Sequence, residues 1–257
     1  MELITLKSPR EQELMRRAGR ITAQARALAG GMVQPGVTTK EIDDAVRGFI
    51  RGQGAEPSFL GYGGFTGSAC ISVNEVVIHG IPSKKIVLKE GDIVSIDVGA
   101  YIDGYHGDCA ATYFCGEPSG EARRLVEVTQ QSFWEGIKMA RAGQRVSDIS
   151  HAVQVFVEAH GYSVVRDFVG PGVGTKLHEA PEVPNFGPAG HGARLRPGMV
   201  IAVEPMVCAG GWQVKVLKDG WTTVSADGSL ASHYENTILI TEGDPEVLTV
   251  TEDGAYV

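Results

Sequence analysis

Four acidic residues occur in apolar, β-rich surroundings where an isolated carboxylate would be costly to bury. Two of them end similar runs, because "GDIVSID" ends at Asp97 and "GMVIAVE" ends at Glu204. Asp108 and Glu235 lie in two further β-rich runs, and Glu235 on its own is equally well explained as a solvated edge residue. An ionisable side chain that ends a buried strand must be paired or bound to a metal. These carboxylates are therefore the first candidates for chemistry.

Four carboxylates in one pocket would repel one another strongly unless cations bind or protons are taken up. Two divalent ions would neutralise their formal charge. A set dominated by oxygen suits Mn²⁺, Fe²⁺, Co²⁺ or Mg²⁺ better than it suits a thiolate-rich zinc site. A paired-metal centre can bind a water as nucleophile, lower the pKa of that water and polarise a carbonyl group. The predicted chemistry is therefore hydrolysis.

The stretch "IVSIDVGAYIDGYHGDCAATYF" predicts how two of these carboxylates meet. Asp103 and Gly104 form a good two-residue hairpin turn. That turn sets Asp108 opposite Gly99, on the same face as Asp97 and diagonal to it, because side chains alternate along each strand. A late strand over residues 232–241 is expected to present Glu235.

An internal repeat relates the two halves of the chain. Residues 36–54 and 143–161 share a pattern at an offset of 107 residues, and both predict an amphipathic helix. The same offset aligns Asp97 with Glu204, and a slightly different one aligns His79 in "VVIHGIP" with His178 in "GTKLHEAP". The sequence thus predicts two similar α+β halves that each supply one histidine and one carboxylate. A gene duplication could also preserve such pairs without a function for them.

Composition sets the class of protein. The chain has 257 residues, 43% hydrophobic and 21% charged, with a formal net charge of −8. These values are typical of a globular protein and argue against a nucleic-acid or anionic-membrane surface. No stretch approaches the roughly 20 apolar residues that span a bilayer, so we expect a cytoplasmic protein. The four cysteines lack zinc-finger spacing, and we expect reduced thiols.

Five segments resemble the motifs of one known family. They are "GYGGFTGSACISVNEVVIHGIP", "GDIVSIDVGAYIDGYHGD", "LHEAPEVPNF", "GMVIAVEPMV" and "DGSLASHYENTILIT". They are similar to the motifs of type I methionine aminopeptidases of the short bacterial form, from about residue 8 to residue 250. The resemblance implies the α+β "pita-bread" fold, with two pseudo-symmetric halves around a central metal site. We expect one catalytic domain over residues 1–257, with halves at about 10–117 and 118–250.

The resemblance also implies roles for individual residues. The metal ligands would be Asp97, Asp108, Glu204 and Glu235, holding up to two divalent ions such as Mn, Fe or Co. Glu204 would be the general base toward the metal-bound water. His178 would hydrogen-bond the scissile carbonyl group, and His79 would contact the substrate backbone and assist proton transfer. Four residues match positions that line the methionine pocket, and each is alternatively explained by ordinary core packing: Tyr62, Phe65, Cys70 and Trp221.

One position departs from the family pattern. The family has Gly-His-Gly where this chain has Gly170-Pro171-Gly172, and that histidine is the only nitrogen ligand of the metal centre. Proline has no side-chain donor, so the remaining set is all oxygen and should favour hard ions. We expect one ion to bind about 10- to 100-fold more weakly. A water could fill the gap, and spacing does not support His160 or His191 as a substitute.

The sequence therefore predicts a metal-dependent hydrolase that removes the initiator methionine from nascent proteins, with activity weakened by Pro171. The alternative is an inactive protein of the same fold that binds peptide N-termini or another partner. We expect a monomer that acts on nascent polypeptide N-termini and does not bind nucleic acid or a membrane. Ribosome contact is compatible with this function, but a cluster of basic residues is better explained as a solvated turn: Lys84, Lys85 and Lys89.

Overall fold

The computed structural model describes residues 3–251 of the chain. This part contains four α-helices: α1 (Pro9–Gly31), α2 (Thr39–Gly52), α3 (Gly120–Ile137) and α4 (Val146–Ala159). The first two helices begin at capping boxes, because the Ser8 and Thr38 hydroxyls accept hydrogen bonds from backbone N–H groups one turn later. A 3₁₀ turn covers Tyr62–Gly64.

Fifteen strands, most of them short, complete the secondary structure of residues 3–251. They are β1 (Glu56–Pro57), β2 (Ala69–Val73), β3 (Val76–Ile78), β4 (Ile93–Ile102), β5 (Tyr105–Phe114), β6 (Ser163–Val164), β7 (Val169–Gly172), β8 (Glu179–Pro184), β9 (Val200–Val203), β10 (Met206–Cys208), β11 (Val214–Val216), β12 (Thr223–Ser225), β13 (Ala231–His233), β14 (Glu235–Leu239) and β15 (Glu246–Val247).

One sheet joins both halves of the chain. Among residues 3–251 it runs β1-β4-β5-β14-β9-β7-β8, with β2 added on β4 and β15 on β14. The strands of this sheet pair antiparallel. The central contact is therefore between β5 of the first half and β14 of the second. Two smaller sheets have the orders β13-β10-β6 and β11-β12-β3.

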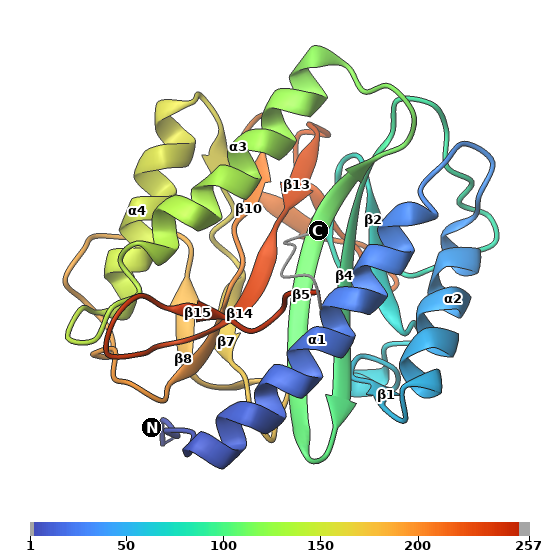
Figure 1. Ribbon diagram of the computed structural model, residues 1–257. Helices are drawn as coiled ribbons and strands as arrows, with labels where there is room; N and C mark the ends of the chain where they lie inside the picture. Colours follow the sequence, from blue (N-terminus) through green and yellow to red (C-terminus); the bar gives the residue numbers. More distant parts are fainter. Residues whose placement is uncertain (1–2, 252–257) are drawn as a thin grey trace.

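Helices cover one face of this sheet. Figure 1 shows α1 lying across β4 and β5, with α2 beside it, while α3 and α4 cover the other half. Ile96 and Val98 of β4 belong to the hydrophobic core beneath α1 and α2. Because side chains alternate along a strand, Asp97 between them points to the opposite face of the sheet. The helices and their cores thus hold the carboxylate face in place from behind.

The predicted repeat is visible in the elements. Both bounds of α4 follow those of α2 by 107 residues, and β9 begins 107 residues after β4. The two halves differ in one respect, because Asp97 lies within the long strand β4, whereas Glu204 directly follows the short strand β9. The expectation that both carboxylates end a strand is thus wrong for Asp97, because the pairing with β5 continues through Ile102.

The predicted hairpin is confirmed. Asp103 and Gly104 both have positive φ, 52° and 88°, as the two central residues of a tight hairpin turn require. Asp108 pairs with Gly99, and Asp97 pairs with Ala110. Asp97 and Asp108 therefore lie diagonally on one face, as the sequence predicts.

The single strand expected over residues 232–241 is two strands. β13 pairs with β10, whereas β14 pairs with β9 and β5, so the chain changes sheets at Tyr234. The backbone N–H of Tyr234 donates to the carbonyl oxygen of Pro205 at this crossing. No glycine or proline marks the crossing between residues 231 and 241, which is why the sequence resembles one strand.

Candidate metal centre

A row of paired residues across four strands builds the centre of the site. Cys70 pairs with Asp97, Asp97 with Ala110, and Ala110 with Glu235. Directly paired residues share a face, so Cys70, Asp97 and Glu235 all point away from the helices. The small side chain of Ala110 leaves room between the two carboxylates.

Asp108 and Glu204 complete the group of four predicted carboxylates. Asp108 lies two residues before Ala110 on the same face of β5, and Glu204 follows Val203, which pairs with Asn236. All four side chains line one cavity of about 730 Å³. Oxygens of three of them are buried without a hydrogen-bond partner in the described part of the chain: Asp97 Oδ1, Asp108 Oδ1 and Glu235 Oε1.

Burial and mutual repulsion make this cluster a poor place for bare negative charge. Burial raises the pKa of Asp97 to about 7, against the opposing effects of a hydrogen bond with Asp108 and then of the charge of Arg26. Burial, and then the charges of the neighbouring carboxylates, raise the pKa values of Asp108, Glu204 and Glu235 well above their ordinary range. Carboxylate oxygens that lie together without hydrogen-bond partners are suitable ligands for divalent cations. Bound cations would offset the negative charge and coordinate these oxygens.

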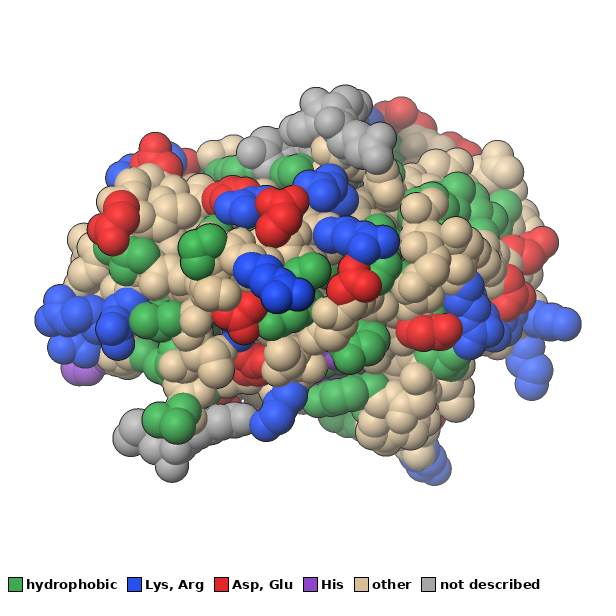
Figure 2. All heavy atoms as spheres, turned by 60° about the horizontal axis from the view of Figure 1, so that its bottom comes forward, with side chains coloured by type: hydrophobic (Ala, Val, Ile, Leu, Met, Phe, Trp, Pro, Cys, Tyr) green, Lys and Arg blue, Asp and Glu red, His purple; other side chains and the backbone are tan. Residues whose placement is uncertain are grey.

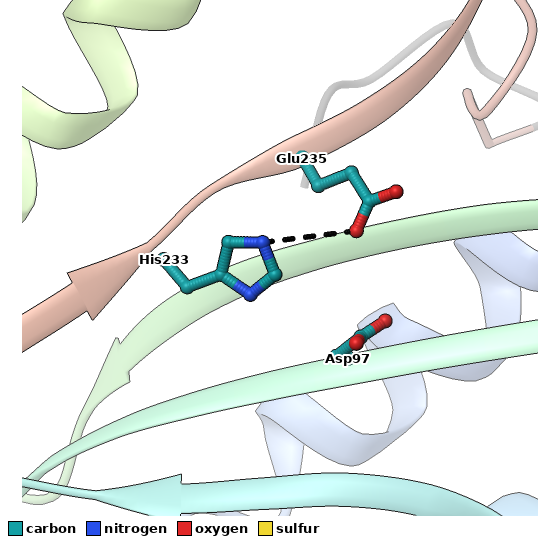
Figure 3. A group of neighbouring side chains, drawn as sticks. All are labelled: Asp97, His233 and Glu235. Atoms are coloured by element: carbon teal, nitrogen blue, oxygen red, sulfur yellow. Dashed lines mark ion pairs between the residues drawn. The ribbon is translucent and has the colours of Figure 1, made fainter. Parts of the chain in front are cut away.

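A histidine that sequence analysis did not select also points into this cluster. His233 ends β13 and is 2% exposed. Its Nε2 lies 3.8 Å from Glu204 Oε2 and 3.8 Å from Glu235 Oε2, which is too long for a hydrogen bond. Burial, with a smaller contribution from the charge of His79, lowers the pKa of His233 to about 3, so its ring is neutral. Figure 3 shows the ring directed toward Glu235, with Asp97 facing both from β4.

A signal for His233 was present in the sequence. His233 and Glu235 are two residues apart in a β-rich run, and such residues share a face of a strand. His160 and His191, the two histidines weighed as substitutes for the missing ligand at position 171, do not line the cavity. His160 Nδ1 lies 2.7 Å from the carbonyl oxygen of Phe156 in a hydrogen bond, and His191 is exposed.

An apolar pocket adjoins the carboxylates in the same cavity. Phe65 and Cys70 are buried in its wall together with Phe59 and Leu177, which sequence analysis missed. Trp221 packs against this group, and its ring centroid lies 5.2 Å from that of Phe65. The structure therefore places Phe65, Cys70 and Trp221 on the cavity wall and leaves their part in binding as a prediction.

The two predicted histidines lie at the same cavity. Burial, and then the charge of His178, lower the pKa of His79 to about 4, and burial lowers the pKa of His178. Both rings are therefore neutral near pH 7. Tyr62 Oη and His178 Nδ1 lie 2.9 Å apart in a hydrogen bond, which fixes the orientation of the imidazole. The second ring nitrogen of His178 is left for another partner.

Pro171 also lines the cavity. The register between β7 and β8 shifts between Gly170 and Gly172, so the strand accommodates a proline where a backbone donor is not required. An added Cβ at Gly170 would lie 2.4 Å from the carbonyl oxygen of Ala202, so β7 runs very close to the strand that precedes Glu204. Position 171 is therefore beside the carboxylate cluster but offers it no donor atom.

The surface and helices add two observations. The face turned forward in Figure 2 carries interleaved acidic and basic side chains rather than one basic field. Ion pairs that link distant segments include Arg16 with Glu246 and Arg17 with Asp103.

Within residues 3–251, none of the helices has the length and apolar character to cross a membrane.

A buried carboxylate cluster beside an open, partly apolar cavity is the arrangement of a metal-dependent hydrolase. The chain belongs to metallopeptidase family M24, whose family model matches residues 13–242. It is 51% identical to the methionine aminopeptidase of Clostridium acetobutylicum over 250 residues, covering 97% of this chain and 100% of that protein. It is also 51% identical to methionine aminopeptidase 1 of Bacillus subtilis over 247 residues, covering 96% and 99%.

The fold agrees with these relatives. The crystal structure of a methionine aminopeptidase from Thermotoga maritima matches with a TM-score of 0.95 and 46% identity, over 96% of this chain and 99% of that one. The predicted family and the predicted pita-bread fold are thus confirmed.

Proposed function

We propose that this chain removes the N-terminal methionine from newly made polypeptides in the cytoplasm by metal-dependent hydrolysis of the first peptide bond. The observation that carries the proposal is one cavity that joins four carboxylates, of which Asp108 and Glu235 are buried, to an apolar pocket. The relatives named above, which are methionine aminopeptidases, support the same activity. The alternative of an inactive binding protein receives no support from them.

Asp97, Asp108, Glu204 and Glu235 would hold up to two divalent ions, with Mn²⁺, Fe²⁺ and Co²⁺ as the candidates. Such ions supply a Lewis acid and lower the pKa of a water molecule near neutral pH. Once cations offset the charge of the cluster, Glu204 is ionised and accepts a proton from the attacking water at its carboxylate. Glu204 suits this role because its side chain is 14% exposed toward the cavity, whereas that of Glu235 is 3% exposed.

His178 and His79 handle the peptide. In the tautomer with its proton on Nε2, His178 accepts a hydrogen bond from the Tyr62 hydroxyl at Nδ1 and donates one from Nε2 to the scissile carbonyl oxygen. Such a donor is worth most where negative charge develops on that oxygen. His79 lies against Trp221, with ring centroids 5.9 Å apart, and contacts the substrate backbone. The released amine takes the proton that Glu204 accepted from the water, with His79 assisting the transfer, so Glu204 is ionised again.

Specificity comes from the apolar end of the cavity. Phe65, Cys70 and Trp221, with Tyr62 at its exposed edge, surround a methionine side chain, whose thioether packs well against aromatic rings. A small second residue passes between this pocket and the carboxylates more easily than a bulky one.

Methionine release from a Met-Ala-Ser peptide tests the proposal. With saturating Mn²⁺ or Co²⁺, we expect turnover by the wild-type chain and a loss of about 10²- to 10⁴-fold in kcat for Glu204→Gln. His191→Gln is the matched control, because His191 is exposed and lies outside the cavity. A chain that binds the metal but releases no methionine would contradict the proposed function.

A further inference from the structure

His233 is a buried imidazole whose surroundings do not account for it. Its Nε2 is buried without a hydrogen-bond partner among residues 3–251. A buried polar atom without a partner destabilises the folded state. Nearby oxygens that could accept a hydrogen bond, in Glu204 and Glu235, lie 3.8 Å away. The nitrogen therefore faces the carboxylates without bonding to them.

These distances suit a shared cation. Ligand atoms of Asp97, His233 and Glu235 all lie within 4.8 Å of one another. An ion that sits about 2.1 Å from each ligand atom separates two opposite ligands by about 4.2 Å. The distances of 3.8 Å from Nε2 lie within that span, and a separation at the 4.8 Å limit would need to close by about 0.6 Å. Figure 3 shows the three side chains converging from β4, β13 and β14.

We propose that His233 Nε2 is a ligand of the metal centre and supplies the nitrogen donor that Pro171 cannot provide. The centre then consists of four carboxylates and one imidazole rather than oxygen alone. A nitrogen donor shifts preference from Mg²⁺ toward Mn²⁺, Fe²⁺ and Co²⁺. The inference rests on the metal centre of the proposed function but not on its peptide substrate.

Other histidines fit this role less well. His79 and His178 line the cavity, but His178 is already bonded to Tyr62 through Nδ1. His79 packs edge-on against Phe168 and Trp221. Neither is paired in the structure with a carboxylate of the cluster, whereas His233 lies equally close to two of them.

Proton NMR of the Co²⁺-loaded protein tests the proposal directly. The ring N–H of a histidine that binds Co²⁺ resonates far outside the normal range and disappears in D₂O. We expect such a signal in the wild-type protein at saturating Co²⁺, its loss in His233→Gln, and its retention in the control His191→Gln. We also expect calorimetry to show about 10- to 100-fold weaker Co²⁺ binding in His233→Gln.

Two outcomes would overturn the proposal: no shifted exchangeable signal in the Co²⁺-loaded wild type, or a signal that persists unchanged in His233→Gln. Thermal unfolding without metal checks that the variant folds, and His233→Asn serves if it does not. Methionine release is measured separately. Turnover without the shifted signal removes this inference alone, whereas the signal without turnover removes only the proposed function.

Discussion

Pro171 and His233 have opposite effects on the donor set of the proposed metal centre. Pro171 places a side chain without donor atoms on the cavity wall, where β7 runs close to the strand that leads to Glu204. His233 places a buried nitrogen 3.8 Å from two of the carboxylates. If both act on the same ion, their effects on metal binding must depend on each other.

A double-mutant cycle measures this dependence. We expect Pro171→His to lower the Mn²⁺ concentration for half-maximal methionine release by less than about tenfold in the wild-type background. In the His233→Gln background the same change should lower it by about 10- to 100-fold, because only there does the site lack a nitrogen. An equal gain in both backgrounds would show that position 171 and His233 act independently.

The carboxylates of the site were predictable from the sequence, whereas His233 was not selected. Asp97 and Asp108 are joined by a tight turn, so their diagonal placement follows from local rules alone. His233 and Glu235 belong to different sheets in the structure, and their common direction depends on the crossing at Tyr234. The sequence does not show which buried atoms lack a hydrogen-bond partner. That observation, which draws attention to His233, requires the folded structure.

At the scale of elements, one buried ion pair attaches the segment before α1 to β8. Lys7 Nζ lies 2.7 Å from Glu179 Oε2, and the two side chains are 4% and 9% exposed. The backbone N–H of Lys7 also donates to the carbonyl oxygen of Gly198, 2.7 Å away. Burial alone would raise the pKa of Glu179, but hydrogen bonds from Lys7 and the Lys176 backbone hold it at about 2.

Lys7→Met is expected to lower the free energy of unfolding by about 3 kcal/mol at pH 7, because it leaves Glu179 buried and charged. The depressed pKa of Glu179 means that its contribution is full above about pH 4.3, the unfolded value, and is lost as the pH falls toward 2. The difference between the two proteins should therefore shrink below pH 4. Urea unfolding at several pH values measures it.

The exposed pair of Arg51 and Glu56 is the control for that experiment. Their side chains are 53% and 65% exposed, so Arg51→Met should change the free energy of unfolding by less than about 1 kcal/mol. Lys7→Met could lower the free energy of unfolding by no more than Arg51→Met does, or by an amount that does not change with pH. Either result would show that the ion pair of Lys7 and Glu179 does not stabilise the protein.

The helices of the repeat were easier to predict than the strands. The helix pattern is local, and α2 and α4 lie within the ranges that the repeat predicts. Strand partners depend on distant segments, as in β14, which joins β5 and β9 across the two halves. The sequence could therefore align Asp97 with Glu204 and extend the strand of Asp97 to the turn at Asp103, but it could not show that β14 joins the two halves.

At the scale of the whole molecule, the central sheet concentrates negative charge between the two halves. Asp97 and Asp108 come from the first half, and Glu204 and Glu235 come from the second. The two cores lie behind this face, one under α1 and α2 and one against α3 and α4. Cations at the centre would therefore link the halves as well as offset the charge.

Stability should consequently depend on pH and metal together. Burial raises the pKa of Asp97 to about 7, against about 3.9 when unfolded. Without metal, the folded state holds more protons between these values, so stability falls as the pH rises from about 4 to 7. Divalent ions replace these protons. At 100 times its dissociation constant Mn²⁺ should add about 2.7 kcal/mol, or about 5–10 °C in Tm, at pH 8. The same Mn²⁺ concentration should add much less at pH 5.5, and an equal shift at both values would contradict the argument.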